Sequence, residues 1–347
     1  MIDDEIISQG IGNVKDAIRE DAFQGKKVLV TGGAGFIGSW LCDTLVGLGA
    51  GVTALDDLST GKIENINHLT GNLEFRFLQC NVSAFETGER FDYIFHLAGH
   101  ASPEEYQLHP IETLQVSAFG SASMAELARK SDATIVFTST SEIYGDAEVL
   151  PTPETYWGKV NPIGPTSCYD EGKRFAEALF VAYHRQYGLK LRIPRVFNSY
   201  GPRLREDGFY GRAMSRFIMQ ALTDNPITIY GDGKQTRSFC YITDTITGLL
   251  LLTLSENANG EVVNIGSSEE IAILELAKKI KEATKCKSDL VFYPLPKDDP
   301  KRRSPDIGKL QKLVNWKPEV SFEEGLKKTI RWFSLNIEKH NPEHSLI

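Results

Sequence analysis

A glycine-rich turn between a predicted strand and a predicted helix constrains this fold more than any other sequence feature. Residues 26–33, KKVLVTGG, form an apolar run that ends in glycines, and a helical pattern follows over residues 36–48. Gly32 permits a tight turn, Gly35 lets the backbone approach a ligand, and Gly38 allows close packing of helix on strand. The free N–H groups of such a helix start bind phosphates well. The segment therefore predicts the first βα unit of a nucleotide-binding sheet.

Strand and helix signals alternate from this turn to about residue 198. Strands separated by helices predict βαβ units with right-handed crossovers, and hence an α/β fold with a doubly wound parallel sheet of the Rossmann type. Further strands are predicted over 51–57, 73–82, 91–99, 133–141 and 189–198, and long helices over 110–130 and 169–188.

An acidic residue at the end of the second strand completes a dinucleotide-binding pattern. Asp56 follows Gly38 by about 18 positions, as this pattern expects. Its carboxylate suits the adenosine ribose hydroxyls and repels a 2′-phosphate, so NAD is favoured over NADP. Asp57 could share this role. The other expected cofactor contacts are Gly32, Gly35, Phe36, Ile37, Asn81, Val82, Leu97, Ala98, Tyr169 and Lys173.

Beyond residue 198 the chain breaks into shorter pieces rich in glycine and proline, which predict a smaller substrate-binding lobe. The N-terminal residues form either a short amphipathic helix laid on the body or a flexible tag. The expected division is an N-terminal extension at 1–23, an NAD-binding domain at 24–200 to which 233–260 returns, and a substrate lobe from 201–232 and 261–340.

Tyr169 and Lys173 stand four positions apart in a predicted helix, so both side chains lie on one face. A tyrosine with a pKa of about 10 is a poor base at neutral pH. A lysine ammonium beside it would lower that pKa toward the working range. The pair therefore predicts Tyr169 as a general base.

The composition limits the partners. A net charge of −8 argues against nucleic acid, which wants a basic surface. No apolar run approaches the roughly 18 residues of a membrane span, and the acidic start lacks the features of a secretory signal. Five cysteines without metal-ligand spacing predict reduced thiols in the cytoplasm and no bound metal.

The chain resembles the extended short-chain dehydrogenase/reductase family of nucleotide-sugar enzymes over nearly all residues beyond 25. The resemblance rests on the order TGGAGFIG, LDD, HLAG, STSEIYG, YxxxK and RVFNSYGPR. Within that family the chain is most similar to UDP-glucuronate decarboxylases, in TSTSEIYGD, ETYWGKVNPIGPTSCYDEGKR, QTRSFCYITD and DDPKRRSPDI.

The resemblance implies a redox-neutral conversion of UDP-glucuronate to UDP-xylose. Tyr169 would remove the C4 hydroxyl proton while hydride passes to NAD⁺. The 4-keto sugar acid would then lose its carboxylate, and hydride would return to C4. By the same resemblance Ser139 would bond the C4 oxygen, Ser141 and Glu142 would lie near the departing carboxylate, and Arg237 would handle that carboxylate. The implied substrate contacts are Asn198, Arg237 and Arg303, with Arg203 and Arg212 as helpers.

The chain departs from the decarboxylase pattern in three ways. Gly99 and His100 replace a Ser-Pro pair, Gln115 and Ser117 replace a lysine that contacts substrate and an asparagine, and Asn81 replaces an acidic residue that often holds the adenine edge. A nucleotide-sugar 4-epimerase or C4 dehydrogenase with the same apparatus therefore remains an alternative. A chain that only binds NAD or a nucleotide sugar is a third hypothesis, and Tyr169→Phe would leave such a binder unaffected.

The family resemblance also implies a homodimer, in which two long helices of each chain form a four-helix interface. Phe175, Leu179, Ala182 and Tyr183 follow helical spacing and could form such a face.

Overall fold

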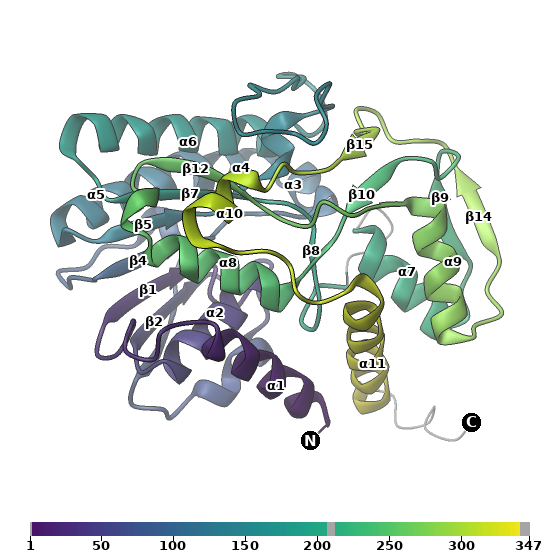
Figure 1. The fold of residues 1–347 in the computed structure, drawn as a ribbon, viewed down its shortest axis with the longest axis horizontal. Coiled ribbons are helices and arrows are strands. Elements are labelled where there is room, and N and C mark those ends of the chain that lie inside the picture. Colours follow the sequence, from purple (N-terminus) through teal and green to yellow (C-terminus); the bar gives the residue numbers. More distant parts are fainter. Residues whose placement is uncertain (1, 207–211, 341–347) are drawn as a thin grey trace.

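A parallel sheet forms the centre of the molecule (Figure 1). The structure, a computed structural model, describes residues 2–206 and 212–340. In these residues the sheet has eight strands in the order β12-β7-β5-β4-β1-β2-β3, with β6 beside β7, and all its pairs are parallel. The strands are β1 Lys27–Thr31, β2 Gly51–Asp56, β3 Phe75–Gln79, β4 Tyr93–His96, β5 Thr134–Phe137, β6 Ser139–Thr140, β7 Leu191–Val196 and β12 Glu261–Ile265.

Helices cover both faces of this sheet (Figure 1). Strand β1 shows why both must be covered: Val28 and Val30 belong to one hydrophobic core and Leu29 to the other. A strand buried on both sides needs a continuous apolar run, which the sequence supplies. The doubly wound α/β fold is confirmed. The covering helices are α2 Phe36–Gly47 and α8 Ile242–Leu254 on one face, and α5 Ser121–Ser131 and α6 Ser167–Tyr187 on the other.

The long helix predicted over 110–130 contains a π-helical turn. It divides into α4 Pro110–Gln115, the turn η4 Val116–Gly120, and α5. At Gly120 a Cβ atom would come within 2.7 Å of the Val82 side chain, so the helix and the segment after β3 approach closely there. A π turn inserts one extra residue into the helix and often marks a functional region.

A smaller lobe lies to the right of the sheet in Figure 1. It combines a three-stranded sheet, β13-β10-β15, with the pair β14-β9 and packed helices. Its elements are α7 Ala213–Leu222, β9 Ile227–Tyr230, β10 Thr236–Ser238, β13 Glu270–Ala272, α9 Ile273–Thr284, β14 Leu290–Tyr293, β15 Arg302–Arg303 and α11 Phe322–His340. Connecting elements are α3 Pro103–Leu108, β8 Ser199–Tyr200, β11 Cys240–Tyr241, α10 Gly308–Val314 and the short turns η1 Ile63–Asn65, η2 Asn67–Leu69, η3 Val82–Ala84, η5 Ser141–Tyr144 and η6 Glu256–Ala258.

The structure places two segments differently from the expected division. Residues 261–265, assigned to the lobe, form β12 and pair with β7 at the edge of the large sheet. Residues 236–238, assigned to the sheet domain, form β10 in the lobe. Short strands in a chain that crosses between lobes carry too little pattern to assign from sequence. The predicted segment 201–232 includes residues 207–211, which lie outside the described residues.

The N-terminal extension forms helix α1 Ile2–Asp16, which packs against α2, α8 and α11. Val14 and Ile18 are buried in the large core. Gly10 faces the Trp40 ring, which a Cβ atom there would approach within 2.9 Å. The segment is therefore a helix laid on the body and not a flexible tag. Within residues 2–206 and 212–340, no helix is both long and apolar enough to cross a membrane.

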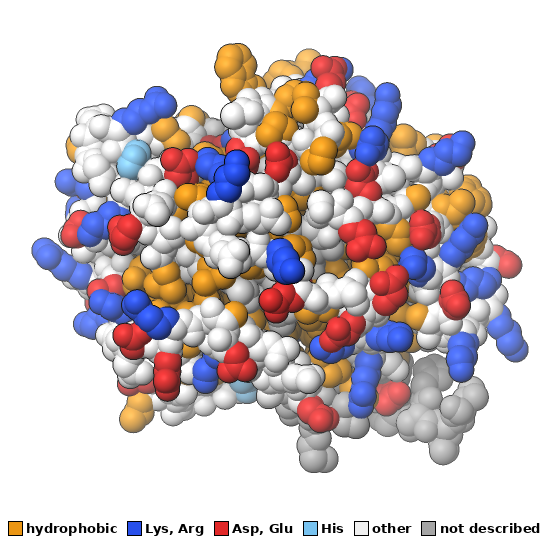
Figure 2. All heavy atoms as spheres, viewed as in Figure 1, with side chains coloured by type: hydrophobic (Ala, Val, Ile, Leu, Met, Phe, Trp, Pro, Cys, Tyr) orange, Lys and Arg blue, Asp and Glu red, His pale blue; other side chains and the backbone are white. Residues whose placement is uncertain are grey.

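Positive and negative side chains intermingle over the face that Figure 2 shows. Hydrophobic side chains gather at the top of that view, over the loop between η5 and α6. Trp157 and Ile163 in this loop are exposed by 88% and 91%.

Candidate active site

A cavity of about 810 Å³ lies between the carboxyl edge of the sheet and the smaller lobe. It begins at the turn after β1 and ends at Arg303 in the lobe. The strand order reverses between β1 and β4, and ligands of open α/β sheets bind in the crevice at such a reversal.

The turn after β1 is shaped for close approach of backbone to backbone. Gly32 has φ +71°, and a Cβ atom there would lie 3.0 Å from the Ala98 amide nitrogen. At Gly38 a Cβ atom would come within 2.0 Å of the Gly32 carbonyl oxygen. Gly35 caps α2, whose first turn carries no acidic residue. The free helix start therefore fits the diphosphate of a dinucleotide.

Asp56 and Asp57 both line the cavity, but their partners differ. The Asp56 carboxylate accepts the amides of Ala34 at 3.0 Å and Leu58 at 2.9 Å, which ties the glycine turn to the loop after β2. Burial raises the pKa of Asp56, and these two amides oppose that effect. Asp57 accepts the Ser59 amide at 3.0 Å and the Ser59 hydroxyl at 2.6 Å. Two carboxylates at the end of β2 fit the ribose hydroxyls of NAD.

The other expected cofactor contacts line the cavity with one exception. Asn81 does not line it, since its side chain caps η3 through the Ser83 amide and donates to Asp57 at 3.0 Å. Asn81 therefore reaches the site through Asp57. The expected contacts that line the cavity are Gly32, Gly35, Phe36, Ile37, Gly38, Val82, Leu97, Ala98, Tyr169 and Lys173.

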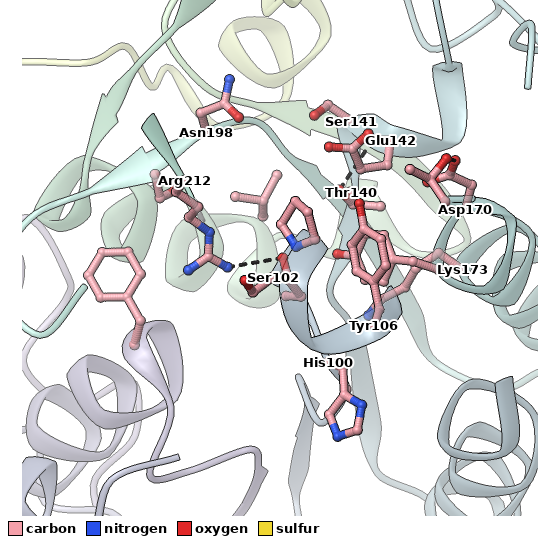
Figure 3. A pocket seen from close by; sticks show the side chains of 18 of the residues that line it. His100, Ser102, Tyr106, Thr140, Ser141, Glu142, Asp170, Lys173, Asn198 and Arg212 are labelled. Carbon is pink, nitrogen blue, oxygen red and sulfur yellow. Dashed lines mark hydrogen bonds between the residues drawn. The ribbon is translucent and has the colours of Figure 1, made fainter. Parts of the chain in front are cut away.

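Tyr169 is buried and stacks on Tyr106 from α3, with ring centroids 5.1 Å apart and planes 6° from parallel. Figure 3 shows Tyr106 and Thr140 together at this end of the cavity. Burial raises the pKa of Tyr169 to about 12, and a hydrogen bond with Thr140 opposes the rise. The positive charge of Arg212 also lowers it.

Lys173 is on the same face of α6, as expected, but its contacts differ from the expectation. Its ammonium donates to the Thr138 carbonyl at 3.0 Å and lies 4.9 Å from the Phe137 ring centroid. Burial lowers the pKa of Lys173 to about 8. The groups that lower the pKa of Tyr169 here are Thr140 and Arg212, and burial of the phenol outweighs both.

Ser139 lines the cavity, but its hydroxyl donates to Glu177 at 2.6 Å. Glu177 also pairs with Arg195 at 2.7 Å, so this bond belongs to a buried structural network. The expected bond from Ser139 to the C4 oxygen of a sugar is therefore not supported. Thr140, the next residue, contacts Tyr169 and is better placed for that bond.

Three charged side chains converge from distant segments. Glu142, at the start of η5, makes a two-point ion pair with Arg303 from β15. Arg237 from β10 pairs with Asp299 at 2.9 Å and donates to the Pro300 carbonyl. Glu142, Arg237 and Arg303 all line the cavity. Arg303, an expected substrate contact, thus lies beside Glu142, which was expected near the departing carboxylate.

Asp170, next to Tyr169, also lines the cavity and is buried. Burial and the negative charge of Glu142 raise its pKa to about 7, while a hydrogen bond from Thr166 opposes the rise. The hydroxyl of Thr166 donates to one Asp170 oxygen at 2.6 Å. Besides Glu142, the site therefore holds a second carboxyl group, Asp170, that is partly protonated near neutral pH.

Asn198 and Arg212 lie on the lobe side of the cavity (Figure 3). Asn198 donates to the Ser238 carbonyl at 3.4 Å, and Arg212 to the Ala101 carbonyl at 3.2 Å. Arg203 does not line the cavity. It is buried in an ion pair with Asp43 at 2.6 Å, so the expected substrate contact is replaced by a structural one.

The positions that depart from the decarboxylase pattern fall in different places. Gln115 is exposed at the end of α4 and does not line the cavity. Ser117 is buried against α6, where a Cβ atom on Gly172 would come within 2.8 Å of its hydroxyl. His100 lines the cavity. His96, the last residue of β4, is buried, and its Nδ1 lies 2.8 Å from the Thr31 hydroxyl oxygen.

The sequence interpretation missed several cavity residues. Thr140 lies in a run of three hydroxyl residues, Ser139-Thr140-Ser141, and the sequence does not show which of the three hydroxyls contacts Tyr169. Tyr106 is marked in the sequence only as an aromatic residue soon after Ser102-Pro103, and Asp170 only as an acidic residue next to Tyr169. At the lobe end the missed residues are Arg205, Arg216, Tyr230, Gln235 and Phe239.

The described residues contain no group of three or more His, Cys, Asp or Glu side chains that could hold a metal ion. A dinucleotide cradle joined to a buried tyrosine and lysine defines a nucleotide-binding enzyme of the short-chain dehydrogenase type. The chain belongs to the NAD dependent epimerase/dehydratase family, whose model matches residues 28–266.

Two kinds of relative agree with this membership. The chain is 45% identical over 313 residues to UDP-glucuronic acid decarboxylase 1 of Danio rerio, covering 90% of this chain and 74% of that protein. An epimerase of Methanothermobacter thermautotrophicus has a TM-score of 0.86 at 32% identity, covering 94% of this chain and 96% of that one. UDP-glucuronic acid 4-epimerase of Bacillus cereus, solved with UDP-glucuronic acid and NAD, has a TM-score of 0.80 at 29% identity, covering 89% and 99%. The resemblance read from the motifs is confirmed.

Proposed function

We propose that the protein converts UDP-glucuronate to UDP-xylose and CO₂, with NAD as a cofactor that undergoes no net change. The observation that carries this proposal is the group Glu142, Arg237 and Arg303 in the same cavity as Tyr169. A sugar carboxylate needs cations to bind it and an acid to reprotonate the carbon it leaves. The 45% identity to a UDP-glucuronic acid decarboxylase supports the same reaction.

The cofactor supplies hydride chemistry at C4 of the sugar, and the glycine cradle with Asp56 fits it. The chain's own residues manage protons and charge. Tyr169, bonded to Thr140, takes the proton of the C4 hydroxyl. With a pKa raised to about 12 by burial, it requires positive charge close by, and Arg212 provides part of it.

Loss of the carboxylate breaks the C5–C6 bond, and its electron pair remains on C5, delocalised into the C4 ketone. CO₂ departs and C5 needs a proton. Arg237 and Arg303 hold the carboxylate before it departs, and Asp299 and Glu142, their respective ion-pair partners, orient the two guanidinium groups. Asp170, with a pKa of about 7, can carry the proton that C5 receives.

The lobe end of the cavity suits the nucleotide. Arg212 and Arg216 supply positive charge for a diphosphate. Tyr230, whose ring lies 4.9 Å from the Arg216 guanidinium, offers an aromatic surface, and Gln235 adds amide hydrogen-bonding groups. An aromatic surface beside an amide suits a planar base such as uracil.

Proton NMR of the protein incubated with UDP-glucuronate and NAD tests this function. UDP-xylose is expected to appear as UDP-glucuronate disappears. UDP-galacturonate in its place would establish 4-epimerisation, the alternative that the Bacillus cereus structure makes plausible. No turnover by wild type, with binding retained, would point to a binder. Tyr169→Phe should abolish turnover and leave nucleotide-sugar binding intact.

We also propose a homodimer that uses α4, η4 and α6. Ile111, Phe119 and Phe175 on these elements are exposed by 66%, 62% and 50%. Leu179 and Tyr183 continue the face on α6 as half-buried residues, and Ala182 is exposed. Large apolar side chains in such a row favour association. Light scattering should give twice the 38.6 kDa chain mass, and the double variant Phe119→Lys, Phe175→Lys should halve that value. A wild-type mass of one chain would disprove the dimer.

We propose the cytoplasm as the compartment. In the described residues all five cysteines are free, and three of them are buried. Buried thiols without disulfides are typical of a reducing compartment. Cell fractionation with an antibody to the chain would test this, and recovery outside the cytoplasm would contradict it.

A further inference from the structure

His100 lies between the loop after β2, which carries Asp57 and Ser59, and helix α4. It follows β4 and Gly99, it is buried, and its ring lines the cavity. Figure 3 shows the ring beneath the segment that carries Tyr106. The mechanism proposed above gives His100 no role.

The Nδ1 atom of His100 has a fixed partner. It lies 3.1 Å from the Thr113 hydroxyl oxygen. Thr113 has one hydroxyl hydrogen, which it donates to the His109 carbonyl at 2.7 Å. The Thr113 oxygen can therefore only accept from His100. Since a neutral imidazole carries one hydrogen, that hydrogen is on Nδ1 and the Nε2 atom has a lone pair.

The Nε2 atom faces Ser59, and here the neutral ring lacks a good partner. The two atoms, Nε2 and the Ser59 Oγ, lie 3.5 Å apart. Ser59 donates its own hydroxyl hydrogen to Asp57 at 2.6 Å, a charge-assisted bond that is much stronger than a long bond to a ring nitrogen. Two lone pairs then face each other. When Nε2 gains a proton, it donates to Ser59, and the chain from His100 through Ser59 to Asp57 is complete.

Groups on four segments set the charge of His100. Burial and His109, whose ring centroid is 5.8 Å away, lower the pKa of His100 from 6.5. Asp57 in the loop after β2, Glu105 on α3 and Glu112 on α4 oppose that change. The lowered pKa of His100 favours the neutral ring at neutral pH, and acidification shifts the ring toward its protonated form.

We propose that His100 is a positioning residue for NAD, whose protonated ring orients Asp57 through Ser59 for the adenosine ribose and so makes NAD affinity depend on pH. The protonated ring also adds a positive charge to the wall that faces the anionic cofactor. Binding and protonation then favour each other reciprocally. The inference rests on NAD binding, which the family shares, and not on the sugar or on decarboxylation.

The experiment measures the dissociation constant of NAD⁺ by calorimetry, without sugar nucleotide, from about pH 5.5 to about pH 8. Wild type is expected to bind about threefold to tenfold more tightly at the acidic end, since a pKa rise of one unit on binding corresponds to a tenfold change. His100→Asn keeps a donor for Thr113 but cannot gain charge, and Ser59→Ala interrupts the chain. Both variants should lose most of this dependence.

His184→Asn is the matched control, because His184 bonds the Leu189 carbonyl outside the cavity. It should keep the wild-type pH profile. A second readout is the His100 ring carbon resonance in NMR, whose titration should move to higher pH when NAD is added. If His100→Asn does not fold, Ser59→Ala still tests the proposal, because Ser59 is exposed and its replacement should not disturb folding. A wild-type pH profile in Ser59→Ala, or an unchanged His100 titration on NAD binding, would overturn the proposal.

Discussion

Arg237 and Arg303 are register partners on two adjacent parallel strands, β10 and β15, although they are far apart in the sequence. Each has its own carboxylate, Asp299 for Arg237 and Glu142 for Arg303. Two guanidinium groups held side by side at the wall of a cavity form a site for an anion. Burial makes both charges costly to maintain, so an anionic ligand should stabilise this arrangement.

Replacement of either arginine by lysine should separate their roles. Arg303→Lys loses the two-point ion pair with Glu142. Arg237→Lys loses the guanidinium that donates at once to the Asp299 carboxylate and to the Pro300 carbonyl. One charge-assisted hydrogen bond of about 1.5–3 kcal/mol corresponds to about 10- to 100-fold in kcat/KM for UDP-glucuronate. We expect Arg303→Lys to lower kcat and Arg237→Lys chiefly to raise KM.

Arg302→Lys provides the matched control. Arg302 precedes Arg303 on the same strand, is exposed, and pairs with Glu270 away from the cavity. Steady-state kinetics should be unchanged in this variant. Loss of activity in Arg302→Lys equal to that in Arg303→Lys would show that the strand itself, and not the buried guanidinium, is required.

Thr140 and Ser139 should differ in their effect on kcat when each hydroxyl is removed. Thr140→Val removes the bond to Tyr169, so kcat should fall by about 10- to 100-fold. It also removes the acceptor of the Glu142 amide, so stability should fall by about 1 kcal/mol. Ser139→Ala removes a donor from Glu177, so unfolding should become easier by about 1 kcal/mol while kcat changes little. Kinetics and urea unfolding of both variants check this. An inactive but stable Ser139→Ala would restore the role that the sequence analysis assigned to Ser139.

The fold could be read from the sequence because its signals are local. The strand that contains Val28 and the glycine turn after it are continuous patterns, and each predicts its own element. The π turn at residues 116–120 and the pairing of β12 with β7 were not predictable, since both depend on packing between distant segments.

The candidate site was predictable where one motif carried the chemistry, as for Tyr169 and Asp56. The site was not predictable where the function of a side chain depends on which residue it contacts in the fold. Arg203 and Arg303 are both arginines in polar segments, yet one is paired with Asp43 in the core and the other with Glu142 in the cavity. Only the fold determines which carboxylate each arginine contacts.

Arg203→Met should destabilise the protein without weakening substrate binding. Removal of Arg203 takes away the permanent charge that pairs with the buried Asp43 carboxylate and leaves it with His68 alone, which costs about 3 kcal/mol. Thermal unfolding should show a lower midpoint, while KM for the nucleotide sugar should stay near wild type because Arg203 does not line the cavity. An increased KM with unchanged stability would return Arg203 to the substrate site.

Lys173→Met should make the NAD-free protein more stable at neutral pH. The pKa of Lys173 is lowered from 10.5 to about 8 by burial, so the charged ammonium opposes folding at pH 7 by about 3 kcal/mol. Loss of the bond to the Thr138 carbonyl takes back about 1 kcal/mol, which leaves a gain of about 2 kcal/mol. The sign follows from proton counting. Between the folded and unfolded pKa values the unfolded chain binds more protons, so wild-type stability from this group rises with pH through that range.

Urea unfolding of wild type and Lys173→Met at about pH 7 and about pH 10 measures this difference, which should shrink as the pH rises. Lys190→Met is the control, because Lys190 is exposed and pairs with Asp132. Its stability relative to wild type should not depend on pH in this way. A Lys173→Met variant that is less stable than wild type at both pH values would mean that the ammonium stabilises the fold. The buried lysine would then be held by its contacts with Thr138 and Phe137 and not retained at the expense of stability.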